Sequence, residues 1–271
     1  MSGEASRPRS HRIQNRTIGA VLLAEFILLL GHPLFGWFTK HYAATPAPLT
    51  FVPPMPPSGD QVLRELSIKA ADITGGSLTS GLPYSYVKRV SWSLADSKGS
   101  SSSLALRPTT TATWLSPDRD GRIVVHRPRR GVRTAVAPPR DLPDLQGPTP
   151  SGVMAFGTNA GDFPRLVTIA DAEPIPSSAE AQILLRLARI PRVVNLGSVT
   201  DRDGRPGLAV SVPWSSSGAN VRFILIFRRT TGALLEADEE LLQGSGRLHA
   251  RAGAVISYTI FLDSKRTRHA G

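Results

Sequence analysis

The sequence predicts an α+β fold that consists of an N-terminal transmembrane helix, a proline-rich linker and an antiparallel sheet packed with two helices. Three features of the 271 residues lead to this prediction. A membrane-length apolar run lies near the start, a stretch rich in proline follows it, and strand patterns joined by tight turns fill most of the remaining chain. Runs of strands with a few separate helices are typical of α+β domains built on an antiparallel sheet.

The apolar run covers residues 17–38 and is preceded by four arginines, Arg7, Arg9, Arg12 and Arg16. A helix of this length spans about 33 Å at about 1.5 Å per residue, which is enough to cross the hydrocarbon core of a bilayer. Because basic residues stay on the cytoplasmic side, we expect residues 1–16 in the cytoplasm and the rest of the chain outside the cell membrane. The sequence therefore predicts a single-pass, uncleaved signal-anchor.

Two alternatives to the anchor remain open. Glu25 lies near the middle of the run, where a carboxylate costs about 2.5–3.5 kcal/mol and each strongly apolar residue offsets about 0.3–0.6 kcal/mol. Insertion stays favourable by a small margin. A cleavable signal peptide is the first alternative, although residues 41–44 place small side chains at only the last two positions of a cleavage site. A buried core helix is the second, although it would not need the arginines.

The composition changes abruptly after the apolar run. Residues 39–59 contain six prolines and almost no charge, which favours an extended polyproline II conformation and a semi-rigid spacer. We expect this linker to hold a folded extracytoplasmic domain, residues 60–264, some distance from the bilayer. Residues 265–271 are expected to form a basic tail.

Inside the domain, residues 61–74 and 178–190 have the apolar spacing of amphipathic helices. Residues 127–150 are rich in proline and arginine and are expected to form an irregular connection, as are the Ser-Gly pairs such as Ser151-Gly152. Strand patterns cover residues 84–94, 105–115, 123–126, 193–200, 208–213, 221–228, 234–242 and 254–262. The most apolar of these, 221–228, is expected at the centre of the sheet.

The pentapeptide Asp-Arg-Asp-Gly-Arg occurs twice, at residues 118–122 and 201–205, each time between two strand patterns. The string is compatible with calcium binding, but neither copy is followed by the further oxygen ligands and the glutamate that a calcium loop needs. Asp-Gly between alternating segments is a hairpin signal, because glycine accepts a positive φ and aspartate bonds back to the turn. The sequence therefore predicts two turns.

Residues for catalysis are scarce. The absence of cysteine excludes disulfides, thiol catalysis and thiolate metal sites. His126 and His249, the histidines of the predicted domain, lie far apart in the sequence and outside any metal-binding or hydrolase motif. The acidic cluster of Asp238, Glu239 and Glu240 lies on a strand pattern, where adjacent side chains point to opposite faces. We expect no enzyme activity, no cofactor and no metal ligands.

Six blocks resemble, in order and spacing, a family of actinobacterial membrane-anchored proteins that is known mainly by a locus-tag name and has no assigned activity. The blocks are residues 84–92, 114–122, 184–190, 200–210, 231–235 and 252–256. The resemblance covers about residues 60–264 and implies an actinobacterial cell-envelope protein. It also implies a distant similarity to lipoprotein-carrier and sigma-regulator sensor domains, which fold as an open antiparallel half-barrel with helices across the concave face. The departures are Glu25 and the basic insertion around 127–150.

Two functions follow as hypotheses. In the first, the domain binds or senses a lipid or acyl ligand, or docks an envelope or regulatory protein, on an apolar face made of Trp92, Trp114, Phe223, Leu225, Phe227 and Tyr258. The second starts from the net charge of +11. Outside a membrane such charge would meet anionic lipid or wall polymer more readily than nucleic acid, so a structural envelope protein would make contact through Arg127, Arg129, Arg130, Arg133 and Arg140. Both residue sets also fit plain alternatives, an ordinary core and a solvated surface.

Overall fold

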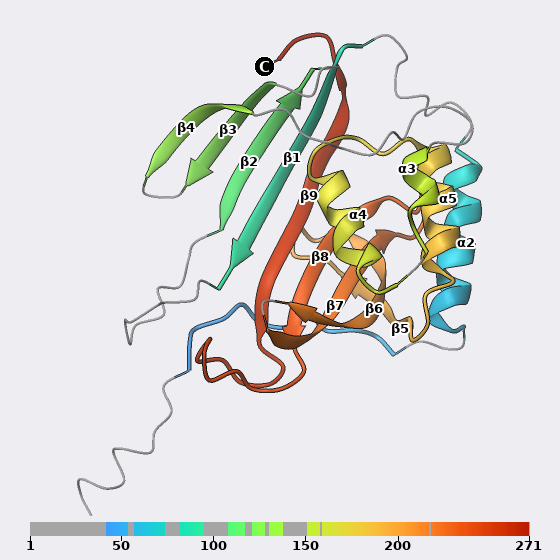
Figure 1. Cartoon of the computed structure of the whole chain (residues 1–271), viewed down its shortest axis with the longest axis vertical. Helices are drawn as coiled ribbons and strands as arrows, with labels where there is room; N and C mark the ends of the chain where they lie inside the picture. The colour runs from blue at the N-terminus through green and yellow to red at the C-terminus, as the bar shows by residue number, and fades with distance from the viewer. Residues whose placement is uncertain are drawn as a thin grey trace, which may run out of the picture. The chain divides into compact units, whose positions relative to one another are not determined.

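The sheet is single, open and antiparallel throughout (Figure 1). The computed structural model describes residues 42–53, 57–73, 82–94, 108–116, 121–127, 130–137, 151–157, 159–216 and 218–270. Nine strands in these ranges follow the order β4-β3-β2-β1-β9-β8-β7-β6-β5, and all neighbours run antiparallel. The edge strands β4 and β5 do not pair with each other. The predicted antiparallel sheet packed with helices is confirmed.

Every strand segment predicted from the sequence overlaps an observed strand. The strands are β1 Tyr84–Ser93, β2 Thr109–Leu115, β3 Gly121–Arg127, β4 Gly131–Ala137, β5 Val194–Thr200, β6 Pro206–Ser216, β7 Ala219–Arg228, β8 Leu234–Leu241 and β9 Val255–Thr267. The expected position of β7 is wrong, because β9 occupies the centre of the sheet. β9 also runs into the expected basic tail, since Lys265 lies opposite Tyr86 of β1.

Strand β4 corrects the prediction of an irregular connection at residues 127–150. Gly131 begins the strand with a φ of 73°, and Val132 and Val136 lie opposite His126 and Arg122 of β3. The strand was not predicted because arginines and prolines dominate the composition of this region. As an edge strand, β4 is short and pairs only with β3. Residues 138–150 of the expected connection lie outside the described residues.

Four helices lie in the described ranges: α2 Gly59–Ala71, α3 Ser151–Met154, α4 Asp162–Ala170 and α5 Ser177–Leu187. The two predicted helices correspond to α2 and α5. Ser151 and Gly152 begin α3 instead of a loop. Helix α4 is short and carries Pro164 in its first turn, so it lacks the length and the cap that make a helix visible in a sequence.

The helices cover one face of the sheet along β5–β9 (Figure 1). Phe223, Leu225 and Phe227 of β7 are at most 4% exposed and pack against apolar residues of α2, α4 and α5, including Leu63 and Leu184. Alternation along the strand places Ile224 and Ile226 on the opposite face. These two side chains are also buried, so this face needs a second cover.

Residues 42–53, which we name the strap, provide that cover. Leu49 and Phe51 pack against the cluster that contains Ile224 and Ile226, and the amide of Val52 donates to the carbonyl oxygen of Ser198 at 2.8 Å. The strap lies along the domain instead of standing free of it. A strand covered on both faces explains why residues 221–228 read as a continuous apolar run.

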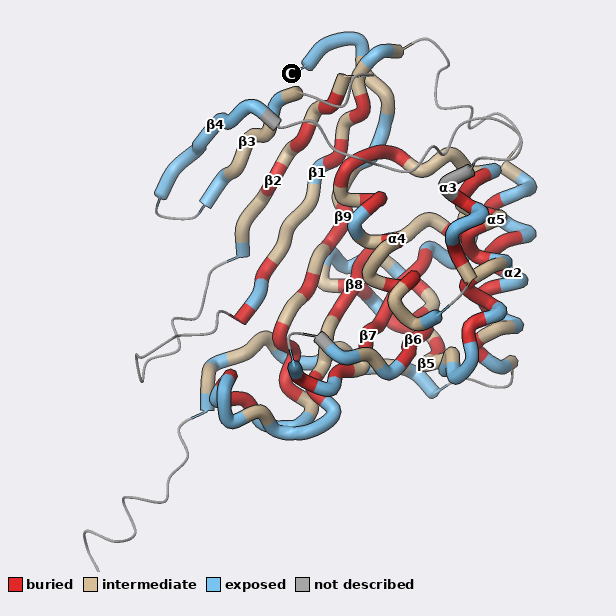
Figure 2. Tube along the Cα trace, in the orientation of Figure 1, coloured by how far each residue is buried: buried red, intermediate tan, exposed pale blue. Residues whose placement is uncertain are grey.

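Strands β1–β4 form a wing at the other side of the sheet. Figure 2 shows that β7 and β8 are largely buried whereas β3 and β4 are mostly intermediate or exposed. The predicted transmembrane segment and the cytoplasmic tail lie outside the described residues. Among the residues that are described, no helix has the length and hydropathy needed to cross a bilayer.

Neighbouring leucines of α5 provide a test of this packing. Leu184 is fully buried between α2 and the sheet, whereas Leu185 is 41% exposed. We expect Leu184→Ala to lower the free energy of unfolding by about 2–5 kcal/mol, because it leaves a cavity. Leu185→Ala should change it by less than about 0.5 kcal/mol. Chemical unfolding followed by circular dichroism measures both, and equal losses would contradict the helix orientation.

Candidate functional site: the pocket beneath the strap

The second Asp-Arg-Asp-Gly-Arg segment forms the turn between β5 and β6, as predicted. Asp201 Oδ1 accepts hydrogen bonds from the backbone amides of Asp203 at 3.1 Å and Arg205 at 2.7 Å, and Gly204 takes a φ of 82°. The carboxylate oxygens of Asp201 are therefore committed to the turn and not to calcium. Of the first copy, residues 118–120 lie outside the described ranges, but Leu115 and Gly121 pair across the hairpin that contains it.

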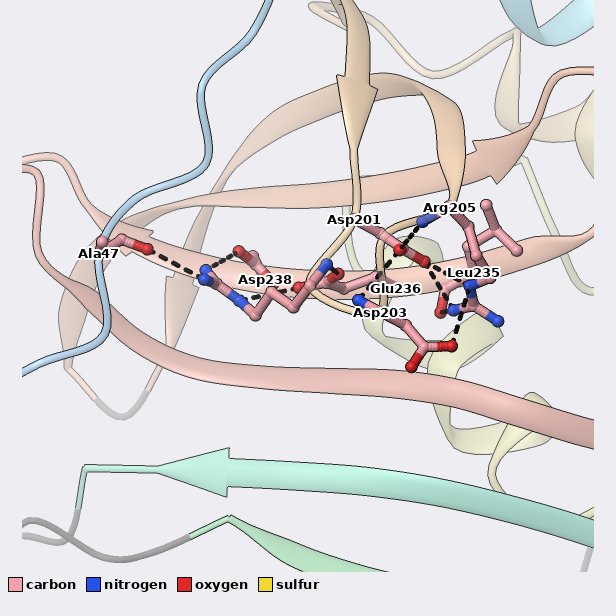
Figure 3. Close-up of polar contacts among 8 residues, drawn as sticks. Ala47, Asp201, Asp203, Arg205, Leu235, Glu236 and Asp238 are labelled. Carbon is pink, nitrogen blue, oxygen red and sulfur yellow. Dashed lines mark hydrogen bonds and ion pairs between the residues drawn. The ribbon is translucent and has the colours of Figure 1, made fainter.

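Arg205 fastens this turn to the sheet. Its Nε donates to Asp201 Oδ2 at 2.7 Å, and its two terminal nitrogens donate to the carbonyl oxygens of Phe261 and Leu235 at 2.7 and 3.1 Å. These carbonyls belong to β9 and β8. The turn therefore folds over the strap face of the sheet instead of extending β5 and β6 into solvent (Figure 3).

Arg202 joins three parts of the chain from the same turn. Its Nε lies 2.9 Å from Glu236 Oε1, one Nη donates to Asp238 Oδ2 at 2.7 Å, and the other donates to the carbonyl oxygen of Ala47 at 2.9 Å. Its guanidinium also lies 4.8 Å from the ring centre of Tyr258. One side chain thus connects the turn, the strand β8 and the strap (Figure 3).

Glu236 and Asp238 bring two carboxyls into the interior. The two residues are 0% and 2% exposed, and their spacing of two places both on the strap face of β8. Burial and the adjacent Asp238 raise the pKa of Glu236 to about 9, although Arg202 opposes the shift. Burial also raises the pKa of Asp238, and the guanidinium of Arg202, which faces both carboxyls, opposes the shift.

An open pocket of about 1310 Å³ lies between the strap and this turn. The strap residues 46–50 and Val52 form one wall, and residues of β5, the turn, the end of β7 and Tyr258 form the others. The lining contains four arginines, Arg202, Arg205, Arg228 and Arg229, and no aspartate or glutamate. The pocket combines an apolar wall and floor with a strongly basic rim.

The four arginines differ in how much of their charge is already balanced. Arg202 and Arg205 are ion-paired with buried carboxyls. Arg228 and Arg229 are exposed at the end of β7, and the structure gives them no ion pair with any described carboxylate. Arg229 donates a hydrogen bond to the hydroxyl of Ser198. The unbalanced positive charge of the pocket is therefore concentrated at Arg228 and Arg229.

The six apolar residues proposed from the sequence do not form one surface. Phe223, Leu225 and Phe227 face the helices, whereas Trp92 and Tyr258 stack at 5.9 Å on the strap face. Trp114 lies in the wing and contacts Tyr86. These residues lie on different surfaces because consecutive positions of a strand point to opposite faces of the sheet. Selecting residues by their aromatic or apolar character alone does not take this alternation into account. Of the six, Tyr258 lines the strap pocket.

A pocket lies between the sheet and the helices. The pocket found there measures about 150 Å³ and lies beside Glu173, Glu180, Leu234 and Phe261. Ligand pockets usually measure about 300–1,000 Å³. The larger pocket lies on the opposite face, beneath the strap.

Three of the five arginines proposed for anionic contact belong to the hairpin of β3 and β4. Arg127 ends β3, Arg133 lies within β4, and Arg130 is in the turn between them. Arg129 and Arg140 lie outside the described residues. Arg133 lies directly opposite Val125, which is two residues before Arg127 on β3. Residues two apart on a strand share a face, and so do directly opposed residues, so Arg127 and Arg133 lie on the same face of the hairpin.

Sequence reasoning missed Arg202, Glu236, Arg228 and Arg229. The sequence does contain a signal for the acidic side of the site. Glu236, Asp238 and Glu240 are spaced by two residues, which places three carboxylates on one face of a strand. Three acids on one face require cations, and Arg202 and Arg222 supply them. No sequence signal indicates that the strap and the end of β7 lie together.

The raised pKa of Glu236 predicts a pH-dependent stability. Its pKa is about 9 in the folded protein against an ordinary 4.5, so between these values the folded state holds a proton that the unfolded state releases. The free energy of unfolding should therefore be highest at the acidic end and fall as pH rises toward 9, by at most about 1.4 kcal/mol per pH unit. Urea unfolding at several pH values measures this decrease in the free energy of unfolding, and Glu236→Gln should remove the part that Glu236 causes. The same dependence of the unfolding free energy on pH in both proteins would contradict the prediction.

Loss of Arg202 should release the strap. Arg202→Gln leaves two buried carboxyls without their cation, which typically costs about 3–5 kcal/mol, and removes the hydrogen bond to Ala47. We expect faster hydrogen exchange at the amides of Ala43 and Val52, with the peptide of α2 unchanged. Arg228→Gln, which lines the same pocket without a described strap contact, is the matched control. Unchanged protection of the strap in the first variant would contradict the assignment.

Comparison with known proteins identifies neither a family nor a curated relative. No family model and no curated protein matches the chain. Among solved structures, MucB in complex with MucA(peri) is 15% identical with a TM-score of 0.30, and the match covers 76% of this chain and 55% of that chain. The chain thus spans just over half of the MucB chain.

Two further structures are similar at this level. A LolA superfamily protein from Nitrosomonas europaea is 10% identical with a TM-score of 0.22, covering 80% of this chain and 96% of that chain. A DUF1329 family protein from Desulfovibrio piger is 10% identical with a TM-score of 0.23, covering 78% and 94%.

Proposed function

We propose that this chain is a membrane-anchored extracytoplasmic domain that binds an anionic amphiphile beneath the strap and catalyses no reaction. The observation that carries the proposal is the lining of the strap pocket, with four arginines and no carboxylate beside an apolar wall. The ligand class that fits is an acyl or similar apolar chain with a carboxylate or phosphate head.

The head group would bind at Arg228 and Arg229. Both side chains are exposed and carry the unbalanced charge of the pocket. Hydroxyl donors surround them, from Ser198, Thr200 and Thr230. Guanidinium groups pair with carboxylate and phosphate oxygens through two parallel hydrogen bonds, so this end of the pocket favours an anion over a neutral head group.

The apolar chain would lie along the strap. Leu49, Val52 and Val199 line that side of the pocket, and Tyr258 lies beneath Arg202. The volume of about 1310 Å³ is at the upper end of the range for ligand sites and suits a lipid-sized molecule. The Tyr258 ring is held in place by its contact with the Arg202 guanidinium and by stacking with Trp92.

The chemistry of the lining supports binding without catalysis. Its residues include no histidine, lysine, aspartate or glutamate, which are the usual general acids and bases. The carboxyls of Glu236 and Asp238, which pair with the lining residue Arg202, are buried. The membrane anchor rests on the sequence of residues 17–38.

Photocrosslinking tests the proposed ligand class. The full chain in proteoliposomes is labelled with a diazirine-bearing fatty acid, and the modified peptides are identified by mass spectrometry. We expect labels on the strap and on residues 198–207, and few from the corresponding neutral fatty alcohol. R228S/R229S should reduce the labelling of these peptides more than about tenfold, since hydrogen bonds to charged groups contribute about 1.5–3 kcal/mol each.

Two controls accompany this experiment. R189S/R251S removes the same charge from exposed positions outside the pocket and should leave strap labelling intact. Labels on residues 17–38 report bilayer partition and should not change in any variant. Labelling confined to residues 17–38, or strap labelling that survives R228S/R229S, would overturn the proposal.

A further inference from the structure

We propose that the wing docks on an anionic lipid surface through a row of side chains that crosses five strands. The row consists of Val136 of β4, Arg122 of β3, Trp114 of β2, Tyr86 of β1 and Lys265 of β9, each directly opposite the next in register. The side chains of directly opposed residues share a face of the sheet. This surface is separate from the strap pocket and does not depend on its ligand.

In the row, two cations flank a pair of aromatic rings that contact each other. Tyr86 and Trp114 have ring centres 4.9 Å apart. The guanidinium of Arg122 lies 5.9 Å from the Trp114 ring centre, and the ammonium of Lys265 lies 5.4 Å from that of Tyr86. Both rings are partly exposed and Arg122 is exposed. Tryptophan and tyrosine flanked by arginine and lysine are typical of surfaces at the membrane–water interface.

The charge of the wing favours an anionic partner. On the face of the row, strands β1–β4 contain Lys88 and Arg122 and no aspartate or glutamate, whereas Arg89, Arg127 and Arg133 lie on the opposite face. Two ion pairs involve cations of this region: Arg89 pairs with Asp171, and Lys265 of the row pairs with Asp263 of β9. Each basic residue close to an anionic bilayer contributes about 1 kcal/mol of attraction.

Two exposed valines distinguish a lipid surface from a soluble polyanion. Val132 and Val136 are 63% and 83% exposed, and both lie on the face of the row, opposite His126 and Arg122. Apolar side chains of this kind enter the boundary between head groups and acyl chains, whereas a hydrated polymer offers them no comparable environment. We therefore commit to a bilayer carrying anionic phospholipid.

The covalent distance to the predicted anchor permits this contact. Only residues 39–41 separate the expected transmembrane segment from the strap, and a few extended residues reach at most about 14 Å. The strap is attached to the same domain as the wing.

A single introduced cysteine can report the contact, because the chain has none of its own. V136C is labelled with the environment-sensitive fluorophore NBD in the full chain, reconstituted in phosphatidylcholine with or without phosphatidylglycerol. We expect a blue shift and quenching by doxyl-labelled lipid when phosphatidylglycerol is present, and little of either in its absence. I68C on α2, which is 60% exposed, serves as the reference position and should show neither.

Charge variants test the cations of the row. R122S/K265S should lower the docked population about twenty-five-fold, about fivefold for each basic residue removed. R64S/K69S removes the same charge from exposed positions of α2 and should have no effect. High salt should weaken the quenching, because the Debye length falls from about 10 Å at 0.1 M to about 3 Å at 1 M.

Three outcomes would overturn the inference. Equal quenching at positions 136 and 68 would show no oriented docking. Two results would show that the row does not recognise anionic lipid: quenching that is the same without phosphatidylglycerol, and quenching that persists in R122S/K265S. A spectral shift produced by soluble poly(glycerol phosphate), without quenching by doxyl lipid, would assign the surface to an anionic polymer instead.

Discussion

The fold of this protein depends on how two buried carboxyls on β8 are balanced. Glu236 and Asp238 point to the strap face of the sheet, where neither can be solvated. Arg202 provides the cation for both, and it can do so only because Asp201 and Arg205 bend the β5–β6 turn over the sheet. The same guanidinium holds the strap through Ala47. One interaction therefore fixes the turn, the strap and the shape of the pocket between them.

This arrangement gives up stability for a defined geometry. Burying a charge costs several kcal/mol even when it is paired, and an apolar replacement is often as stable. Arg202 offsets part of that cost by contacting Tyr258 and by satisfying a strap carbonyl, and the raised pKa of Glu236 favours its neutral form. A purely apolar contact between strap and sheet would hold the same surfaces without specifying where the arginines of the rim lie.

The sequence predicts local structure better than it predicts the site. Period and turn chemistry indicate the strands, α2, α5 and the Asp-Gly turn, because these depend on neighbouring residues. Strand β4 was hidden among prolines and arginines, and β7 was misplaced because its apolar run reflects a cover on both faces. The strap could not be predicted, since prolines specify an extended chain and not what it lies against. The same limit applies to Arg228 and Arg229, which join the pocket only through tertiary packing.

Native mass spectrometry of the full chain released from its own membrane tests the account most directly. The wild-type chain should retain one anionic lipid-sized adduct, which R228S/R229S should lose because the head-group site is gone. R202Q should also lose it because the strap is released, whereas R189S/R251S should keep it. A bare mass for the wild-type chain, or an adduct that R202Q and R228S/R229S retain, would contradict a ligand pocket built by the strap.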